Sequence, residues 1–318
     1  MLDKIFAFAA AIFVMVSTIG CQKDEANGLC GEECSAQLTV ELPQDLLSRA
    51  VSQAGYVDIV YYDVWSEDFA TLLFSGTGTV EGGVAQIDVA LVKDQNYQFI
   101  FWAQNASATS PYSWSNLKKI EVDYSKFTAN NKDCYDAFYA VEPIAADGQN
   151  KTVRLYRPFA QLNFGASTMS ASFGDFEVTE NSVTLSKYAK AFDTVEGMGV
   201  DYVDAPVTFT ASAGGLVQDE TSDHKDLKIG QEAYFWVAMN YLLVPAESKV
   251  NITVDASFTT GQGIVNHRIH NVPVSMNYRT NIVGDLFTNT SQLKIVVEKG
   301  FKGPDGTPNP DENKYLDN

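Results

Sequence analysis

Short segments in which apolar and polar residues alternate recur along most of the chain. The segment "AQLTVEL" (36–42) places Leu38, Val40 and Leu42 on one face of a strand. The segments "VDIVYYDVW" and "YQFIFWAQ" are dense in β-branched and aromatic residues, and "GTGTVEGG" between them has the glycines of a hairpin turn. Helical signals are few. The pattern therefore predicts an all-β protein built from antiparallel sandwiches.

The strand signals fall into two groups, separated by a turn-rich stretch near residues 147–152. A chain of this length suggests roughly two domains. We expect an N-terminal sandwich over 36–150 and a C-terminal sandwich over 151–300. The remainder, 301–318, is rich in Pro, Gly and Asp and is predicted to be a disordered tail.

The segment that opens the second group is strongly apolar. Five of its side chains are predicted to lie in the core of the second domain: Val153, Leu155, Phe159, Leu162 and Phe164. Pro158 has no amide hydrogen to donate, so an edge position or a bulge is expected there. Arg157 is expected to be solvated, with pairing to a carboxylate as the alternative.

The N-terminal residues have the pattern of a targeting segment. Lys4 precedes an apolar run that ends at Gly20, and Cys21 follows directly. The run has the layout of a secretory signal. We expect a lipoprotein signal peptide over 1–20, acylation of Cys21 after cleavage, and a polar tether over 21–35. The alternative is an ordinary signal peptide in which the cysteine occurs by chance.

Composition and charge narrow the classes of partner. The chain is 45% hydrophobic and carries 22 basic against 40 acidic residues, which gives a net charge of −18. This balance disfavours nucleic acid and anionic lipid surfaces, because both need basic partners. No second apolar segment is long enough to span a bilayer, so a lipid is the expected link to the membrane.

The remaining cysteines favour disulfides over metal binding. Cys30 and Cys34 can close a local disulfide, or either thiol can pair with Cys134. A zinc site is not expected, because no second closely spaced ligand pair lies nearby. His267 and His270 are three residues apart, which in a strand turns them to opposite faces. No metal and no cofactor are predicted.

Catalytic motifs are absent from the sequence. No nucleophile elbow, phosphate-binding loop, dinucleotide fingerprint or zinc-protease motif occurs, so no catalytic residue is assigned and no enzyme activity is expected. Four tryptophans could form a sugar-stacking platform but are more often core residues: Trp65, Trp102, Trp114 and Trp236.

Five motifs occur in an order that resembles a known family. They are "FWAQ" (101–104), "DAFYA" (136–140), "RPFAQLNFG" (157–165), "MNYLLVP" (239–245) and "NVPVSMNYRTNIVGDLFT" (271–288). The chain resembles the fimbrillin-like lipoproteins of Bacteroides-type bacteria, within the superfamily of type V pilus subunits. The resemblance implies two tandem transthyretin-like (Greek-key) β-sandwich domains and a role as stalk, anchor or tip of a pilus or as a related adhesin. It implies as partners other pilus subunits or further copies of this chain, the outer membrane through the lipid, and ligands on host or bacterial surfaces.

The resemblance also implies how the protein is exported and modified. Lys23, Asp24 and Glu25 resemble the signal that sends a lipoprotein to the outer face of the outer membrane; a soluble linker is the alternative. The sequence "DTV" (193–195) resembles the acceptor for O-linked glycans in these bacteria, which makes Thr194 a candidate glycosylation site.

A basic residue after the first predicted strand resembles a pilin processing site. Arg49 is the only Lys or Arg between residues 24 and 92. In type V pilins, cleavage after such a residue removes the first strand, and a strand of the next subunit replaces it. Cleavage between Arg49 and Ala50 would empty this position, and "QLKIVVE" (292–298) is a candidate donor strand. The alternative is a solvated arginine in an uncut monomeric anchor or adhesin.

A different functional class remains open from the sequence. A lipid-anchored carbohydrate-binding protein of a glycan-uptake system would also use tandem β-sandwiches. Such a protein requires aromatic side chains exposed on one face, whereas a pilin requires a strand that can be exchanged.

Overall fold

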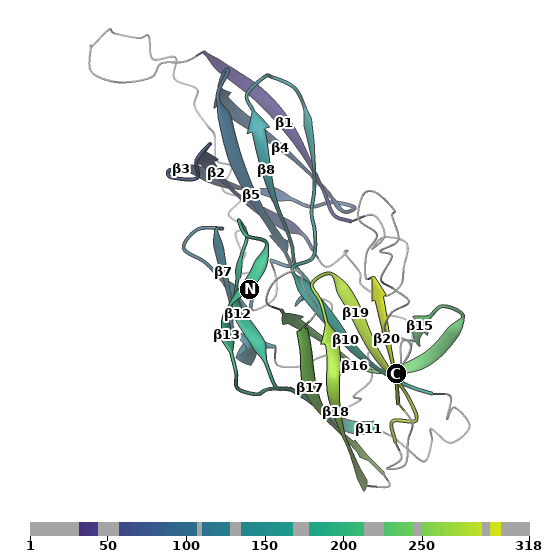
Figure 1. Cartoon of the computed structure of the whole chain (residues 1–318). Coiled ribbons are helices and arrows are strands. Elements are labelled where there is room, and N and C mark those ends of the chain that lie inside the picture. The colour runs from purple at the N-terminus through teal and green to yellow at the C-terminus, as the bar shows by residue number, and fades with distance from the viewer. Residues whose placement is uncertain are drawn as a thin grey trace, which may run out of the picture. The chain divides into compact units, whose positions relative to one another are not determined.

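The structure is a computed structural model of the chain. It describes residues 32–43, 57–106, 110–127, 135–167, 178–212, 226–244, 250–261, 263–287 and 293–299. Contacts divide the chain into Met1–Glu32 and Glu33–Asn318, and all the described strands lie in the second unit. Figure 1 shows that this unit is built from β-sheets.

Two sheets, A and B, come mainly from the first half of the chain. Sheet A has the strand order β4-β1-β9, and sheet B has the order β3-β2-β5-β8. The strands of sheet A are β1 (Glu33–Glu41), β4 (Val84–Val92) and β9 (Lys151–Arg154). The strands of sheet B are β2 (Ile59–Ser66), β3 (Leu72–Thr79), β5 (Asn96–Gln104) and β8 (Phe138–Ala145).

Two further sheets, D and E, come from the second half. Sheet D has the order β15-β16-β10-β19-β20, and sheet E has the order β14-β11-β17-β18. The strands of sheet D are β10 (Phe159–Ala166), β15 (Asp226–Ile229), β16 (Glu232–Leu243), β19 (Tyr278–Gly284) and β20 (Leu293–Lys299). The strands of sheet E are β11 (Val178–Leu185), β14 (Val207–Ser212), β17 (Val250–Thr260) and β18 (Gly263–Val274).

Sheet C joins strands from both halves of the chain. Its order is β13-β12-β7-β6. Its strands are β6 (Tyr112–Ser113), β7 (Lys119–Val122), β12 (Tyr188–Asp193) and β13 (Met198–Val203). A 3₁₀ turn, η2 (Tyr124–Lys126), follows β7 and begins where the Asp123 side chain accepts a hydrogen bond from the Ser125 amide.

The described apolar side chains form two cores. The smaller core lies between sheets A and B and includes Leu38, Ile87 and Phe99. The larger core includes side chains of sheets C, D and E, and in it Phe164 of β10 packs against Phe258 of β17 with ring centroids 5.8 Å apart. Both cores exclude water from large apolar surfaces, which is the main driving force for this arrangement.

Strand β5 belongs to both cores. Successive residues of a strand point to opposite faces of the sheet. Phe99 and Phe101 therefore enter the smaller core, while Ile100 and Trp102 enter the larger one. Because both faces of β5 are buried, its sequence is the continuous apolar run "FIFWA" and not an alternating pattern.

The all-β fold with packed sheets is confirmed, and one detail of the predicted sandwiches is wrong. Sheets A and D each contain a parallel pair, β1 with β9 and β10 with β19. Parallel neighbours need a long connection, so local patterns along the sequence cannot reveal which strands pair in this way. The transthyretin-like count and the domain boundary at residue 150 remain predictions.

Candidate functional site

Strand β1 is the middle strand of sheet A. It pairs antiparallel with β4 from Glu33↔Val92 to Glu41↔Val84. On its other side it pairs parallel with β9, from Leu38↔Lys151 to Glu41↔Arg154. The backbone of β1 is thus bonded on both sides along the second half of its length.

The two faces of β1 have opposite character, as the alternation in the sequence predicts. Leu38, Val40 and Leu42 are buried in the smaller core, and Leu38 has no exposed surface. On the solvent face, Gln37 donates to the Asp88 carboxylate at 3.2 Å and Thr39 donates to the Gln86 side chain at 3.0 Å. The prediction that Leu38, Val40 and Leu42 point inward is confirmed.

The apolar side chains of β1 share the smaller core with side chains of sheet B. Phe99 and Phe101 of β5 stack with ring centroids 5.9 Å apart, and both belong to the smaller core together with Phe138 of β8. Without β1, these rings would lose the apolar layer that covers them. A slot with unpaired backbone of β4 and β9 on its two sides would remain.

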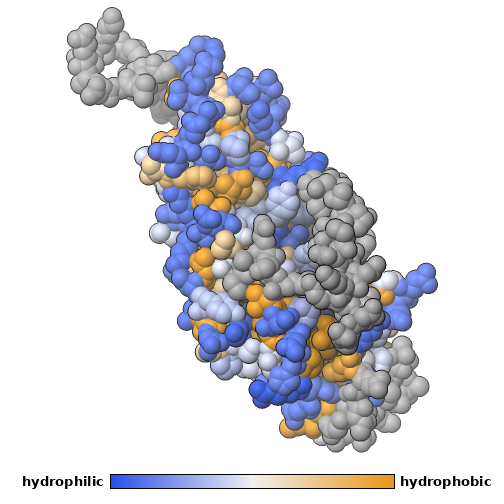
Figure 2. Space-filling view, viewed as in Figure 1, coloured by the Kyte–Doolittle hydropathy of each residue, from blue (hydrophilic) through white to orange (hydrophobic). Residues whose placement is uncertain are grey.

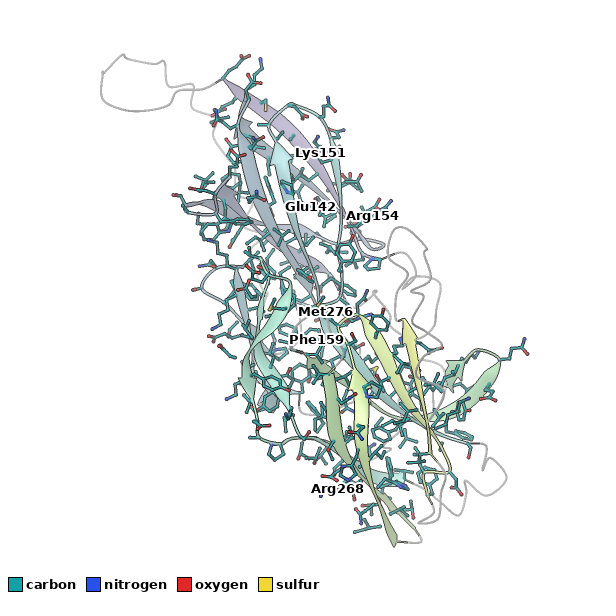
Figure 3. The ribbon with its side chains drawn as sticks, in the orientation of Figure 1. Glu142, Lys151, Arg154, Phe159, Arg268 and Met276 are labelled. Carbon is teal, nitrogen blue, oxygen red and sulfur yellow. The ribbon has the colours of Figure 1, made fainter. Side chains whose placement is uncertain are left out.

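Strand β9 forms the far wall of this slot, and its place was not foreseen. Val153 and Leu155 are buried, as predicted, but they belong to the smaller core and not to the core of the second group of strands. Figure 3 shows Lys151 and Arg154 at the two ends of β9, with Glu142 on β8. Val153 and Leu155 lie in the smaller core because β9 pairs in parallel with β1 and so belongs to sheet A.

Desolvation acts on a carboxyl group close to this wall. Glu142 follows Phe138 and Ala140 on the face of β8 that is turned to the smaller core. Burial raises the pKa of the Glu142 carboxyl above its usual value.

The candidate donor, β20, is an edge strand of sheet D. It pairs antiparallel with β19, from Tyr278↔Lys299 to Gly284↔Leu293. Among the described residues its other edge has no neighbouring strand. A series of side-chain hydrogen bonds also holds β20 in place. Asn163 donates to Asn281 at 2.8 Å, and Asn281 donates to the Glu298 carboxylate at 2.9 Å.

Arg157 is buried and not solvated, which corrects the first expectation from the sequence. Its Nε donates to the Asp136 carboxylate at 2.5 Å, and its second nitrogen Nη2 donates to the other carboxylate oxygen. The guanidinium also lies over the Phe138 ring, 5.0 Å from its centroid. The alternative expectation, a carboxylate partner, is therefore the right one.

Burial has the largest effect on the pKa of the Asp136 carboxyl in this pair. Desolvation raises the pKa of the Asp136 carboxyl, while the charge of Arg157, its hydrogen bonds and the nearby Arg279 act in the opposite direction. Sequence reasoning missed Asp136 as the partner. The signal was present, because an acid directly before the apolar run "AFYA" is expected to need a partner when the run is buried.

The rest of the predicted core of the second group is confirmed. Phe159, Leu162 and Phe164 on β10 are buried in the larger core. At the start of β10, the Phe159 carbonyl accepts a hydrogen bond from the Asn277 amide at 2.9 Å, and Met276 lies beside Phe159 in Figure 3. The register between β10 and β16 shifts at Phe164/Gly165.

Thr194, the candidate glycosylation site, is buried. Its hydroxyl donates to the Leu117 carbonyl at 2.7 Å. The hydroxyl is therefore engaged in the folded chain, and an O-linked glycan at this position would have to be added before folding. Modification of Thr194 remains a prediction.

Most of the other candidate residues lie outside the described part of the chain. These are Cys21, Lys23, Asp24, Glu25, Cys30, Arg49, Ala50 and Cys134, with the signal peptide and the tail 301–318. Cys34 is half-buried on β1 and packs against the smaller core. Its pairing with Cys30 or Cys134 remains a prediction.

Three of the four tryptophans are core residues. Trp65, Trp102 and Trp236 are buried, while Trp114 is half-buried and meets the Tyr61 ring edge-on at 5.0 Å between centroids. A flat row of exposed tryptophans is therefore not present in the described residues.

The described part of the chain contains neither a cluster of metal ligands nor a membrane-spanning helix. No group of three or more His, Cys, Asp or Glu side chains there is placed to hold a metal ion. His267 contacts the Leu286 carbonyl and His270 contacts the Thr253 hydroxyl, so the two rings have different partners. Within these same residues, no helix has the length and apolarity needed to cross a membrane.

Comparison with known proteins places the chain among proteins of the same fold. A family model with the description "Family of unknown function (DUF6562)" matches residues 27–315. None of the curated proteins matches the chain.

Three solved structures similar to this one come from Bacteroides species. A protein from Bacteroides thetaiotaomicron, provisionally described as an adhesin, aligns with a TM-score of 0.52 and 14% identity over 87% of this chain and 98% of that one. A provisional polysaccharide-binding protein of the same species aligns with a TM-score of 0.49 and 14% identity over 86% of this chain and 100% of the other. A provisional cell adhesion protein from Bacteroides ovatus aligns with a TM-score of 0.48 and 14% identity over 84% of this chain and 96% of that one.

Proposed function

This chain belongs to the family of unknown function DUF6562, and we propose that it is a fimbrillin-like lipoprotein of the cell surface. In this proposal it serves as a subunit, anchor or tip of a type V pilus, or as a related adhesin. Its partners are other pilus subunits or further copies of itself, which assemble by strand exchange.

The central place of β1 in sheet A is the observation that carries the proposal. A donated strand binds through main-chain hydrogen bonds to a neighbouring strand and through alternate side chains that enter a core, so an exchangeable strand needs a bonded neighbour and an alternating apolar face. Strand β1 meets both conditions, with β4 and β9 on its sides and Leu38 and Val40 beneath it. Each buried aliphatic side chain contributes about 1.5–3 kcal/mol, so an emptied slot favours the entry of a replacement.

The position of Arg49 supports the processing step. Strand β1 ends at Glu41 and β2 begins at Ile59, so the bond between Arg49 and Ala50 lies in the connection between them. A cut there leaves β1 attached to the rest of the unit only by hydrogen bonds and packing. The released segment would also carry the lipid on Cys21, so an anchor subunit is expected to stay uncut.

Strand β20 supports the other half of the exchange. An edge strand leaves its sheet with the loss of one ladder, whereas a central strand loses two. Leu293, Ile295 and Val297 recur at every second residue, which matches the spacing of Leu38, Val40 and Leu42. The hydrogen bond from Asn281 to Glu298, which helps to hold β20 in sheet D, would be broken on exchange.

The fold and the sequence support a surface location. The similar structure with a TM-score of 0.52 is described as an adhesin. The segment "CQKDE" (21–25) follows an apolar run and fits acylation of Cys21 and sorting through Lys23 to Glu25. We place the protein on the outer membrane through its lipid, with the folded unit facing outward.

Limited trypsin treatment followed by size-exclusion chromatography tests the proposal. Cleavage at Arg49–Ala50 is expected to convert the monomer into larger assemblies, and an Arg49→Gln variant should remain monomeric under the same treatment. A Leu293→Asp variant should be cut normally but should not assemble, because a charge would enter the slot and no new trypsin site is created. Resistance of Arg49–Ala50 to trypsin, or a cut chain that stays monomeric, would exclude strand exchange.

A further inference from the structure

Strand β3 exposes a run of large apolar side chains. Leu72, Leu73 and Phe74 are 38%, 47% and 36% exposed, and they are consecutive in the sequence. Other exposed large apolar residues of the described chain occur singly. Figure 2 shows apolar surface over the region where Figure 1 labels β3. Scattered apolar residues are normal on a surface, but a contiguous group is typical of an interaction site.

The backbone of β3 is available along one side. It pairs with β2, and no other described strand borders it in sheet B. The Val80 amide donates to the Asp58 carbonyl, and bonded pairs alternate in an antiparallel ladder. It follows that Ser75, Thr77 and Thr79 turn their N–H and C=O groups toward the open edge.

The composition of β3 does not protect this edge. Natural edge strands are usually guarded by charged residues or proline. Strand β8 has Glu142 and Pro143, β9 has Lys151 and Arg154, and β20 has two lysines and a glutamate. The sequence of β3, "LLFSGTGT", has neither a charge nor a proline. Strand β14 also lacks both, but its large aromatic side chain, Phe209, is buried.

Acidic residues stand at both ends of β3. Glu67 and Asp68 precede it in the turn from β2, and Glu81 follows it. No Lys or Arg occurs between residues 57 and 92, which spans β2, β3 and β4. Lys118, a cation beside the turn that precedes β3, is already engaged: its ammonium lies 3.7 Å from the centroid of the Trp65 ring and donates to the Phe69 carbonyl.

We propose that β3 binds an extended segment of a partner protein that has uncharged, alternating β-branched residues flanked by lysine or arginine at both ends. The segment adds a fifth strand to sheet B. Its backbone pairs with the outward groups of Ser75, Thr77 and Thr79, and its apolar side chains cover Leu73 and Phe74. The basic flanks meet Glu67, Asp68 and Glu81.

Charge disfavours a second copy of this chain as the occupant. Antiparallel pairing of two β3 strands would bring Glu67 and Asp68 of one copy close to Glu81 of the other. The net charge of −18 adds a long-range repulsion between copies. This surface lies in sheet B and the exchange slot lies in sheet A, so the inference does not depend on the proposed strand exchange.

Binding of labelled peptides to the full, uncut chain in mild detergent tests the inference. The probe is the peptide "KKTVTVTVKK", and its binding is measured by fluorescence anisotropy at low salt. Its controls are "EETVTVTVEE", which reverses the charge, and "KKTVTPTVKK", which interrupts the strand. On the protein side, Thr77→Pro removes an outward amide that β2 does not use, and Thr77→Val keeps that amide.

The expected result is saturable binding of the basic peptide. The acidic and proline peptides, and the Thr77→Pro variant, should each lower the affinity about tenfold or more, which corresponds to about one lost hydrogen bond or ion pair. Thr77→Val should bind as the unchanged chain does. The peptide comparison on the unchanged chain decides the question even if Thr77→Pro folds poorly.

Other results would overturn the inference. These are the absence of saturable binding, equal binding of the proline peptide, or equal binding of the acidic peptide. A dimer of the uncut chain that Thr77→Pro dissociates would show that a second copy occupies β3 instead.

Discussion

Asp136 and Arg157 form a buried ion pair in which both carboxylate oxygens accept hydrogen bonds from the guanidinium. The two residues open the motifs "DAFYA" and "RPFAQLNFG", so the pair ties the start of β8 to the start of β10. Strand β8 belongs to sheet B and β10 belongs to sheet D. A single interaction thus links sheet B, whose side chains share a core with those of β1, to sheet D, which contains β20.

Replacement of Arg157 by methionine is expected to destabilise the fold by about 3–5 kcal/mol, because the Asp136 carboxylate would remain buried without its partner. Arg154→Met, three residues earlier, should change stability by about 0.5 kcal/mol or less, since the Arg154 side chain is 59% exposed. Denaturant unfolding of both variants measures the difference. Adding Asp136→Asn to Arg157→Met should recover part of the loss. Equal stability of the two arginine variants would show that the pair does not contribute.

Truncation of Phe164 to alanine should cost about 3–5 kcal/mol of unfolding free energy. Its ring is fully buried and packs against Phe258, so the change leaves a cavity in the larger core. Phe74→Ala on β3 removes the same atoms from an exposed site and should cost less than about 1 kcal/mol. Thermal unfolding of the two variants gives the comparison. A small loss for Phe164→Ala would mean that β10 does not pack as described.

Glu142→Gln should stabilise the protein at neutral pH and not at acid pH. Burial raises the folded-state pKa of this carboxyl above 4.5, so its neutral form is favoured in the folded state. The penalty is therefore absent below pH 4.5 and develops as the pH rises through the higher folded value. The gain should be no more than about 1 kcal/mol, because the group is only half-buried. Unfolding across this pH range measures it, with the exposed Glu121→Gln as control for the lost charge. A gain that does not vary with pH would exclude desolvation as the cause.

Cys21→Ala should abolish labelling of the protein by a fatty-acid probe in cells. Cys21 follows the apolar run and Gly20, where a lipoprotein signal places its acceptor thiol. Cys34→Ala removes a thiol on β1 and should leave labelling unchanged. In-gel detection of the probe reads both variants. Labelled Cys21→Ala protein would assign the lipid to another residue.

The strands could be predicted from the sequence, but their partners could not. Alternation at Leu38, Val40 and Leu42 gave the inward face of β1 correctly, because burial of one face imposes a period of two. The same pattern does not tell which strands are neighbours. Val153 and Leu155 were therefore placed in the wrong core, although their burial was foreseen.

Buried charge is the second point at which sequence reasoning failed. Arg157 is usually expected at a surface, since an isolated charge is costly to bury. The cost is offset here by Asp136, which lies 21 residues away in sequence and comes close only in the fold. The predicted roles of Cys21, Lys23 and Arg49 are of another kind, because they depend on enzymes that act on the chain.

The central position of β1 also determines how the protein would bear mechanical load. A pull at Glu33 along the axis of β1 would load the whole ladder with β4, from Glu33↔Val92 to Glu41↔Val84, and the shorter ladder with β9 at the same time. Hydrogen bonds sheared together resist force better than bonds peeled apart one by one. A chain held by its N-terminal end in flowing liquid would thus be gripped at a strand that is bonded on both sides along the second half of its length.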